Sequence, residues 1–467
     1  MERRAFLQVG GTIGAGLVLG FRIPGRQGVL PFTPNAWLQV ATDGSVTITV
    51  DKSEMGEGNH TALAMIVAEE LDADWTKVKL GPVPTNPAGW SRSMVTGGST
   101  AVRTSYDLLR KAGATARAML VTAAAQTWGV EPAACRTQKG AVTHANHRST
   151  YGELAQKAAA IPVPENVPLK DPKNFRLLGT HVPRLDTPSK VNGSAQFGID
   201  VRLPGMLVAS VERAPVFGAK VKGFDGTAAK AVPGVRHVVE LTGTPWTSTN
   251  GAWAVGTESG VAVVADSYWQ AVQGRRALQI TWDEGPNATL GAIPAKLAAL
   301  SDQAGVTAQT VGDTAAALAG AAKHLEGVYT VPFLHHATME PMNCTAYVRA
   351  GECEVWAPTQ NQTRAQEVAA EAAAIPKDKV RIHTTLLGGG FGRRLESDFV
   401  AEAVSISKAV NAPVKVIWSR EDDTRHGFYR PATYNKLRAG LDAQNRLVAW
   451  SHHIVAPPIL TKFGPLQ

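Results

Sequence analysis

Three consecutive glycines stand between a strand pattern and a helix pattern in this 467-residue chain. They begin the segment Gly-Gly-Gly-Phe-Gly-Arg-Arg at residues 388–394, after an apolar run at 380–387 and before a helix-like pattern at 398–410. A glycine run at such a junction lets backbone N–H groups approach an anion closely. A tight turn without a ligand is the alternative. The spacing does not fit a dinucleotide fingerprint, because Arg393 stands where a glycine is needed, nor does it fit a Walker A loop.

Two further glycine-containing loops precede helix patterns nearer the N-terminus. One is Glu-Met-Gly-Glu-Gly-Asn-His-Thr at residues 54–61, and the other is Gly-Gly-Ser-Thr at residues 97–100. The spacing of apolar side chains predicts helices at 62–72, 101–128 and 362–374. Three loops of this kind in one chain indicate one extended, phosphate-bearing cofactor that is held from several sides.

Composition and charge exclude several other kinds of protein. Hydrophobic residues make up 44% of the chain and charged residues 18%, which is ample apolar material for a packed core. The net charge is +8, and charged residues are too sparse to form a nucleic-acid-binding surface, so we expect no nucleic-acid partner. The three cysteines cannot supply a disulfide framework, a four-cysteine zinc site or an iron–sulfur cluster. His335, His336 and Glu340 are expected to be structural, because Pro341 disfavours a continuing helix there.

The first residues resemble an export signal. Arg3 and Arg4 precede Phe6 and Leu7, and an apolar, glycine-rich run follows at 9–21. This pattern is typical of twin-arginine export, and it predicts a location in the periplasm or at the periplasmic face of the inner membrane. The basic start of an ordinary buried helix is the alternative. Twin-arginine export carries folded proteins, often with a cofactor inserted, so the signal favours a redox cofactor.

Several motifs together resemble the molybdopterin-binding subunit of the xanthine dehydrogenase and aldehyde oxidase family, and most of all its isoquinoline 1-oxidoreductase beta-subunit branch. They are the loop at 56–61, Met-Glu-Pro at 339–341, the segment 356–362 and the loop at 388–394, in an order that resembles the permuted order of this branch. The resemblance implies an α+β fold of several domains. These are a signal and leader at 1–35, a permuted molybdopterin-binding segment at 36–160, a linker at 161–183, an α/β hammerhead-like domain at 184–288, a linker at 289–327 and an incomplete molybdopterin-binding domain at 328–467.

The resemblance also implies site residues, position by position. Gln360 matches an active-site glutamine beside the oxygen ligands of molybdenum, and Phe391 matches a ring that approaches the metal's oxo group. The matches to cofactor-binding positions are Gly56, Glu57, Gly58, His60, Thr61, Gly98, Ser99, Thr100, Gly389, Gly390, Gly392 and Arg393. Glu57 departs from the pattern, because glutamine is usual there and a carboxylate beside phosphates is unfavourable. No residue matches the family's general-base glutamate, which belongs to a later motif, so we expect a chain truncated at its C-terminus.

The implied activity is that of a molybdenum hydroxylase, which oxidises an aldehyde or an N-heteroaromatic compound with oxygen from water. The implied cofactor is molybdenum–molybdopterin cytosine dinucleotide, with no protein side chain bound to the metal. Because this chain cannot hold a cluster, the electrons would pass to a small subunit with two 2Fe–2S clusters, and a cytochrome c is a candidate for the next acceptor. Two alternatives stay open: a non-catalytic, truncated fragment of such a subunit, and another oxidoreductase that binds FAD or NAD at residues 388–392.

Overall fold

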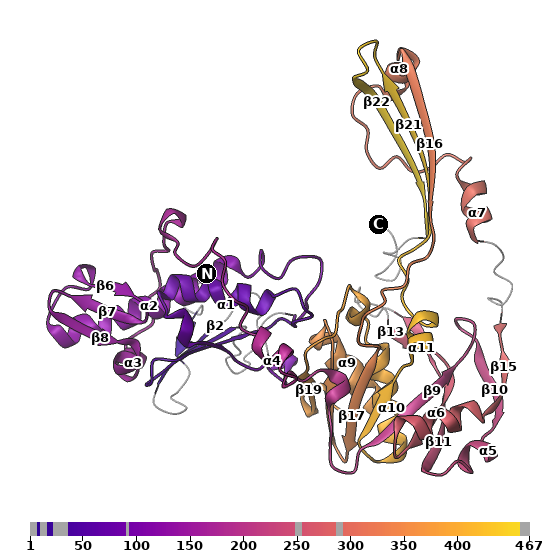
Figure 1. Ribbon diagram of the computed structural model, residues 1–467, viewed down its shortest axis with the longest axis horizontal. Coiled ribbons are helices and arrows are strands. Elements are labelled where there is room, and N and C mark those ends of the chain that lie inside the picture. Colours follow the sequence, from indigo (N-terminus) through magenta and orange to yellow (C-terminus); the bar gives the residue numbers. More distant parts are fainter. Residues whose placement is uncertain are drawn as a thin grey trace.

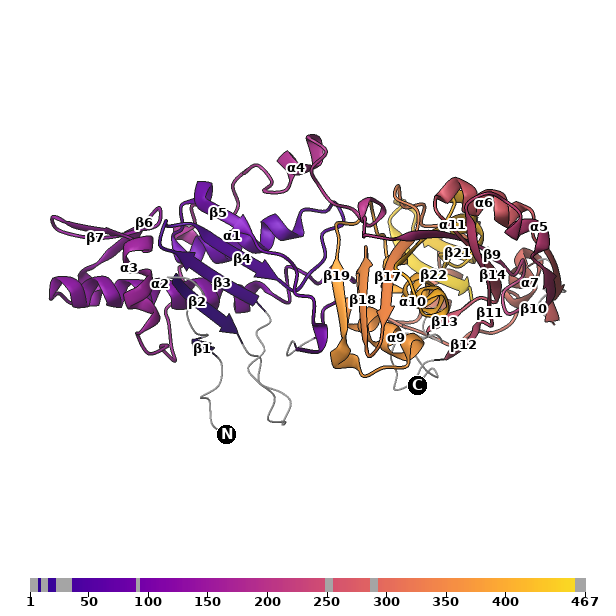
Figure 2. The ribbon, with the colours of Figure 1, turned by 90° about the horizontal axis from the view of Figure 1, so that it is seen from below.

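The computed structural model describes residues 7–9, 16–21, 36–89, 93–247, 255–285 and 293–457. The described residues up to 178 form an N-terminal body, and those between 195 and 457 form a C-terminal body (Figure 1). A long β projection rises from the C-terminal body. Figure 2 shows the two bodies side by side, with loops between their sheets.

The N-terminal body is a five-stranded sheet covered by helices. Its strands follow the order β1 (Leu7–Val9), β2 (Gly16–Phe21), β3 (Ala36–Ala41), β4 (Val46–Val50) and β5 (Val78–Leu80), and only the β4–β5 pair is parallel. The helices α1 (Asn59–Leu71) and α2 (Tyr106–Trp128) pack together over this sheet. The outer end holds β6 (Arg136–Gln138), β7 (Ala141–His144), β8 (His147–Thr150) and α3 (Tyr151–Ala159). Leu38, Ile48, Leu63 and Leu120 lie in one buried apolar core.

The C-terminal body is built on a seven-stranded mixed sheet. The strand order is β11 (Val235–Leu241), β14 (Gly260–Ala265), β9 (Leu207–Arg213), β20 (Val414–Ile417), β17 (Asn343–Arg349), β18 (Glu352–Ala357) and β19 (Val380–Thr384). The helices α9 (Gln362–Ala373) and α10 (Asp398–Val410) bury one face of it in a second apolar core. Smaller elements surround the sheet: β10 (Lys220–Asp225), α5 (Thr227–Lys230), β12 (Thr244–Thr247), β13 (Val255–Thr257), α6 (Tyr268–Arg276), β15 (Gln279–Asp283) and α11 (Arg420–Arg425). The short helix α4 (Thr187–Val191) belongs to the segment that connects the two bodies.

The shared sheet corrects the domain boundaries expected from the sequence. β9, β11 and β14 come from the expected hammerhead-like domain at 184–288, but β9 pairs in parallel with β20 of the last domain. The two segments therefore form one body. The interval 289–327 is not a simple linker either, because it contains α7 (Ile293–Leu300), α8 (Thr314–Ala319) and the beginning of β16 (Lys323–Val331).

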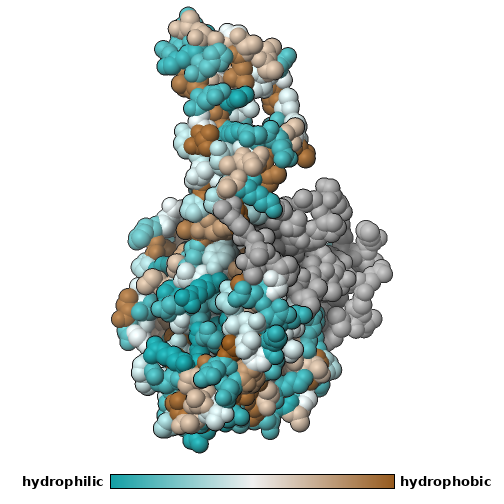
Figure 3. All heavy atoms as spheres, turned by 90° about the vertical axis from the view of Figure 1, so that its right-hand side faces the viewer, coloured by the Kyte–Doolittle hydropathy of each residue, from teal (hydrophilic) through white to brown (hydrophobic). Residues whose placement is uncertain are grey.

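The projection is a three-stranded antiparallel sheet in the order β16, β21 (Thr433–Leu441) and β22 (Leu447–Val455). Helices α7 and α8 pack against β21 and β22. The cross-strand register places Leu325, Tyr329, Trp450 and Ile454 on a common face, and all four side chains are exposed. Figure 3 shows hydrophobic side chains among polar ones along the projection.

The helices expected from apolar spacing are present, although α1 begins at Asn59 and not at residue 62. α9 and α10 match the expected intervals within one residue, but α2 begins at Tyr106 and not at residue 101. Residues 101–105 form a turn instead, with Ser99 in the left-handed backbone region at φ 52°. This turn leaves residues 97–102 as a loop at the junction of the two bodies.

Part of the expected export signal can be placed. Arg3, Arg4 and Phe6 lie outside the described residues. Leu7 belongs to β1, and β2, within the expected apolar run, pairs with β3. Among the described residues, none of the helices has the length and apolar character needed to cross a membrane.

The expected linker at 161–183 is tied to the N-terminal body by a buried carboxylate. Glu69 of α1 accepts hydrogen bonds at 2.9, 2.6 and 3.1 Å from the backbone N–H groups of Arg176, Leu177 and Leu178. Its other oxygen accepts one from Lys170 Nζ at 2.9 Å. Burial alone would raise the pKa of Glu69, but these hydrogen bonds outweigh it and lower the pKa.

Replacing this carboxylate should destabilise the protein. Glu69→Gln removes the charge opposite Lys170 and offers the three N–H groups a weaker acceptor, so we expect a loss of about 3 kcal/mol in the free energy of unfolding. Urea unfolding followed by circular dichroism measures it. The matched control is Glu352→Gln on an exposed part of β18, which should change stability by less than about 0.5 kcal/mol. Equal stability of the two variants would contradict the anchoring role.

Candidate active site

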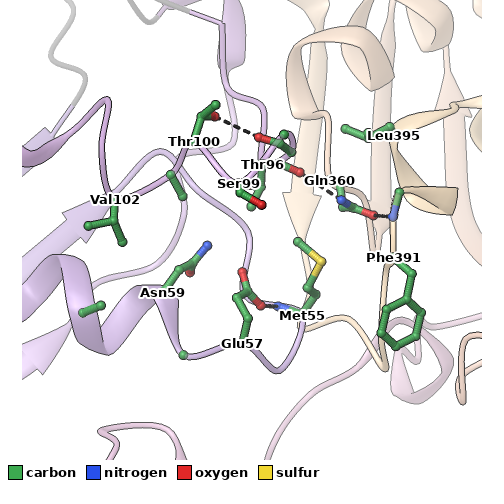
Figure 4. A pocket seen from close by; sticks show the side chains of 16 residues that line it. Met55, Glu57, Asn59, Thr96, Ser99, Thr100, Val102, Gln360, Phe391 and Leu395 are labelled. Atoms are coloured by element: carbon green, nitrogen blue, oxygen red, sulfur yellow. Dashed lines mark hydrogen bonds between the residues drawn. The ribbon is translucent and has the colours of Figure 1, made fainter. Parts of the chain in front are cut away.

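A pocket of about 500 Å³ lies where the two bodies meet (Figure 4). One wall comes from the loop at the start of α1 and from the loop that precedes α2, both in the N-terminal body. The opposite wall comes from Gln360, Phe391, Gly392 and Leu395 in the C-terminal body. The structure thus brings the three glycine-containing loops of the sequence to one cavity, whose size suits a small-molecule ligand.

A seam of buried, uncharged side chains joins the two bodies beside this pocket. It consists of Ser53, Thr96, Thr359, Gln360 and Gln362, none of which is more than 4% exposed. Ser53 Oγ donates to Thr359 O at 2.7 Å and accepts from Gln362 Nε2 at 2.8 Å. The backbone N–H of Ser53 donates to Thr96 Oγ1 at 2.9 Å. Because buried polar groups are costly without partners, this seam fixes the relative position of the two walls.

Gln360 connects the walls directly. Its Nε2 donates to Thr96 O at 2.9 Å, and its Oε1 accepts from the backbone N–H of Gly392 at 3.1 Å. An amide nitrogen carries two hydrogens, so one N–H remains for a ligand in the pocket. Gln360 therefore has a structural task in addition to the role that the sequence suggests for it.

The loop at 388–394 presents a strained aromatic residue to the cavity. Phe391 has a φ of 54°, which is unusual for a residue with a bulky side chain, and the residue is 70% exposed. Gly392 follows with a φ of 99° and also lines the pocket. Gly389 and Gly390 do not line it but support the loop from behind. A Cβ on Gly390 would lie 2.5 Å from Gln360 Oε1 and 2.6 Å from Met55 Sδ, so the two walls touch at this glycine.

Arg393 does not face the pocket, which corrects its expected role in cofactor binding. The side chain is 0% exposed, and its guanidinium donates to both oxygens of Asp398 at 2.9 and 2.8 Å. It also lies over the rings of Trp418 and Phe428, at 5.3 and 4.9 Å from their centroids. A charge paired in this way on the inner side of the loop cannot reach a phosphate.

Hydrogen bonds of the neighbouring Arg394 and of Glu340 hold the same loop in its conformation. Arg394 donates to Gly389 O at 2.8 Å and to Glu340 O at 2.6 Å. Glu340 Oε2 accepts from the backbone N–H of Gly388 at 2.9 Å, and Oε1 accepts from Ile199 N at 3.0 Å.

The described part of the chain contains no group of three or more His, Cys, Asp or Glu residues that could hold a metal ion.

The loop at 54–61 already contains its own anion. Glu54 accepts hydrogen bonds from the backbone N–H groups of Gly56, Gly58 and His60 at 2.9, 2.9 and 3.2 Å. It also pairs with Arg184 NH2 at 3.1 Å. An internal carboxylate therefore occupies the N–H groups that a phosphate was expected to meet at the start of α1.

Three residues of this loop for which the resemblance implies cofactor contacts lie behind the lining of the pocket, and their role stays a prediction. Gly56, His60 and Thr61 do not line the pocket. His60 Nε2 lies 2.7 Å from Lys52 O, and burial lowers the pKa of the ring, so the neutral imidazole donates to that carbonyl. Thr61 Oγ1 accepts from Leu185 N at 3.1 Å. These residues give the loop its shape.

Gly58, Glu57 and the neighbouring Asn59 do line the pocket. Glu57 Oε2 accepts from the backbone N–H of Met55 at 2.8 Å. Asn59 Nδ2 donates to Ser53 O at 2.8 Å, whereas its Oδ1 is buried and has no hydrogen-bond partner among the described residues. Asn59, Thr96 and Leu395 were not singled out in the sequence. Asn59 and Thr96 could have been found from their position in or next to the glycine-containing loops, whereas no pattern in the sequence indicates Leu395.

The chain is similar in sequence to known molybdopterin-binding domains and to two bacterial enzymes. Residues 2–211 and 300–457 each match a family model described as a molybdopterin cofactor-binding domain. The chain is 33% identical to isoquinoline 1-oxidoreductase subunit beta of Brevundimonas diminuta, in an alignment that covers 100% of this chain and 65% of that protein. It is 32% identical to the membrane-bound aldehyde dehydrogenase (pyrroloquinoline-quinone) of Gluconacetobacter polyoxogenes, over 98% of this chain and 60% of that protein.

The chain belongs to the molybdopterin-binding subunits of the xanthine dehydrogenase and aldehyde oxidase family. It spans less than two thirds of the length of the two relatives above. The crystal structure of quinoline 2-oxidoreductase from Pseudomonas putida 86 is also similar, with 22% identity and a TM-score of 0.47, over 59% of this chain and 39% of that one.

The lining of the pocket fits a pterin cofactor that carries phosphate. Gly98 and Ser99 adopt φ values of 60° and 52°, so the backbone of their loop approaches the cavity closely. Ser99 brings a hydroxyl group to the same side, whereas the hydroxyl of Thr100 already donates to Gly97 O at 2.8 Å and shapes the loop. The unpartnered Asn59 Oδ1 offers an acceptor to a ligand N–H, and the free N–H of Gln360 offers a donor.

The close approach of the walls at Gly390 can be tested by adding a methyl group. Gly390→Ala should displace the doubly hydrogen-bonded amide of Gln360 and lower the free energy of unfolding by about 1–3 kcal/mol. Gly223→Ala is the matched control, because a Cβ there meets nothing within 4 Å. Thermal and urea unfolding of the two variants measure the difference. If both are equally stable, the walls do not meet at Gly390.

Proposed function

We propose that this chain forms the molybdopterin-binding part of a molybdenum hydroxylase, which oxidises an aldehyde or an N-heteroaromatic compound with oxygen from water. The pocket between the two bodies carries this proposal, because it unites Gln360, Phe391 and the loop at 97–100 in one cavity. The names of the two relatives support both substrate classes, since one acts on isoquinoline and the other on aldehydes.

Each side chain of the pocket has a task in this proposal. The bound molybdenum cofactor supplies the two-electron redox chemistry. Gln360 orients the metal-bearing end of the cofactor through its free N–H, while its other bonds hold the amide in place. The exposed ring of Phe391 offers an apolar surface to a flat substrate and excludes water from it. The hydroxyl of Ser99 and the backbone of the loop at 97–100 bind the phosphate-bearing end, while Thr100 holds this loop through its hydrogen bond to Gly97 O.

We further propose the cytosine dinucleotide form of the cofactor. The pocket extends from Gln360 past Gly97 to Val102, so a cofactor that begins at Gln360 would place its phosphates at the loop before α2. Resemblance to the isoquinoline branch supports the cytosine base.

Electrons would leave through a small subunit with two 2Fe–2S clusters, and a cytochrome c is a candidate for the next acceptor. Cys135, Cys344 and Cys353 support this proposal, because all three are buried and burial raises the pKa of each thiol. Cys135 belongs to the core of the N-terminal body and the other two to that of the C-terminal body. Isolated thiols of this kind cannot assemble a cluster within the chain.

Cofactor analysis of the full natural chain, purified with the products of neighbouring genes, tests the proposed activity. We expect molybdenum and cytidine nucleotide in equal amounts, together with iron from the small subunit. Gln360→Ala should lower turnover about 10–1000-fold by removing a fixed donor. It should also lower the molybdenum content, because the same amide joins the two walls.

Gln444→Ala is the control, since Gln444 lies in an exposed turn between β21 and β22. Stoichiometric FAD or NAD in place of molybdenum would support the alternative oxidoreductase. A chain without cofactor or turnover would support the non-catalytic fragment. Full activity in Gln360→Ala would contradict the assignment of the site.

The proposed location, in the periplasm or at the periplasmic face of the inner membrane, depends on Arg3 and Arg4. Replacing both with lysine should keep the protein in the cytoplasm, because lysine does not reproduce the planar guanidinium. Cell fractionation and immunoblotting measure the distribution. Unchanged fractionation would show that the two arginines do not direct export.

A further inference from the structure

Glu57 is the only titratable residue in the lining of the pocket, as far as the structure describes the chain. One of its carboxyl oxygens accepts a hydrogen bond from the backbone N–H of Met55 at 2.8 Å. Figure 4 shows the other oxygen turned into the cavity, toward the side where Ser99 lies. The loop with Ser99 and Thr100 is the part of the lining that suits phosphate, so a carboxyl group faces the place of an anion.

The charged groups around Glu57 do not compensate a negative charge there. Glu54, on the same loop, is itself a buried carboxylate. Arg184 lies near, but its guanidinium is shared by Glu54, Asp186 and the carbonyl of Gly56. Lys190 also pairs with Asp186, at 2.5 Å, and lies 3.9 Å from Glu54.

The other elements around the pocket add no free cation among the described residues that line it. His60 lies behind the loop, and burial lowers the pKa of its ring, so it is neutral. Arg393 and Arg394 of the opposite wall are fully buried and turned toward Asp398 and Glu340. Burial raises the pKa of Glu57 above its ordinary value, and the nearby Glu54 carboxylate raises it further.

Asn59 gives independent evidence that this wall is built for a ligand. It is 5% exposed and lines the same pocket two residues after Glu57, and its Oδ1 has no hydrogen-bond partner among the described residues. A buried acceptor without a partner costs free energy unless a ligand supplies a donor. Glu57 and Asn59 therefore belong to one ligand-facing surface.

We propose that Glu57 keeps its proton when the pocket is filled, and that its O–H donates a hydrogen bond to an anionic oxygen of the bound phosphate-bearing cofactor. This inference rests on the proposed function, because it requires an anionic ligand in this pocket. In its neutral form Glu57 acts as a donor. In its ionised form it places a negative charge beside the anion with no free cation to offset it.

The proposal fixes the direction of the pH dependence. A carboxyl group whose folded pKa is raised stays protonated below that pKa and loses its proton as the pH rises through it. Binding of an anion favours the protonated form, and by linkage it raises the pKa of Glu57 further. The cofactor should therefore be held tightly at low pH and released more readily as the pH increases.

Cofactor retention at different pH values tests this. The cofactor-loaded full natural chain is equilibrated between pH 5.5 and 9 and desalted, and molybdenum is measured by mass spectrometry and pterin by fluorescence. For the wild type, we expect the dissociation constant to rise up to tenfold per pH unit above the pKa of Glu57. Glu57→Gln, which keeps a donor but cannot titrate, should remove this slope and retain the cofactor at high pH.

Glu352→Gln, on the exposed surface of β18, is the matched control and should follow the wild-type curve. If Glu57→Gln is insoluble, Glu57→Met serves as a second variant of similar length that does not titrate, and its curve should also be flat. Equal slopes in the wild type and in a Glu57 variant overturn the inference. A wild-type dissociation constant that does not change with pH also overturns it, and this measurement needs no variant. A chain that holds no molybdenum or pterin at any pH overturns the proposed function as well.

Discussion

The pocket depends on a set of uncharged hydrogen bonds between two separate hydrophobic cores. Ser53, Thr96 and the segment with Thr359, Gln360 and Gln362 meet in a buried seam, while each body has its own apolar interior. Apolar contact is non-directional and would tolerate sliding of one body on the other, whereas hydrogen bonds between buried groups allow little change of register. The seam therefore sets the width of the cavity, and Gln360 belongs to both the seam and the cavity.

The loops that line the cavity are held from behind by buried charges. Two ion pairs fix the glycine-rich loop: Arg393 with Asp398 and Arg394 with Glu340. Glu54 accepts the hydrogen bonds of the backbone N–H groups at the start of α1. Such pairs contribute little net stability but impose a unique geometry, because breaking one leaves a buried charge without a partner. They hold Phe391 in a strained backbone conformation with its ring exposed. Arg393, for which the family resemblance implies cofactor binding, is used for this support.

The sequence reveals local structure well where the physical signal is local. The apolar spacing of α9 and α10 and the glycine runs at 97–98 and 388–390 are visible in consecutive residues, so their elements could be predicted. The domain boundaries could not be predicted, because β9 and β20 are paired although more than 200 residues separate them in the chain. The apolar pattern of a strand does not indicate which other strand it pairs with. The same limit applies to α2, whose first turn is replaced by a loop that reaches the other body.

The sequence by itself determined the family, the three loops and the presence of Gln360 and Phe391 near one another. Glycine tolerates backbone conformations that other residues avoid, and such positions leave a mark in the sequence. Only the tertiary structure decided which residues line the cavity. Gly58, Glu57, Ser99 and Thr100 do, whereas His60, Thr61 and Arg393 do not. The reason is that a polar side chain takes the partner that burial brings to it, here Lys52, Leu185 and Asp398, and these partners come from the fold and not from the motif.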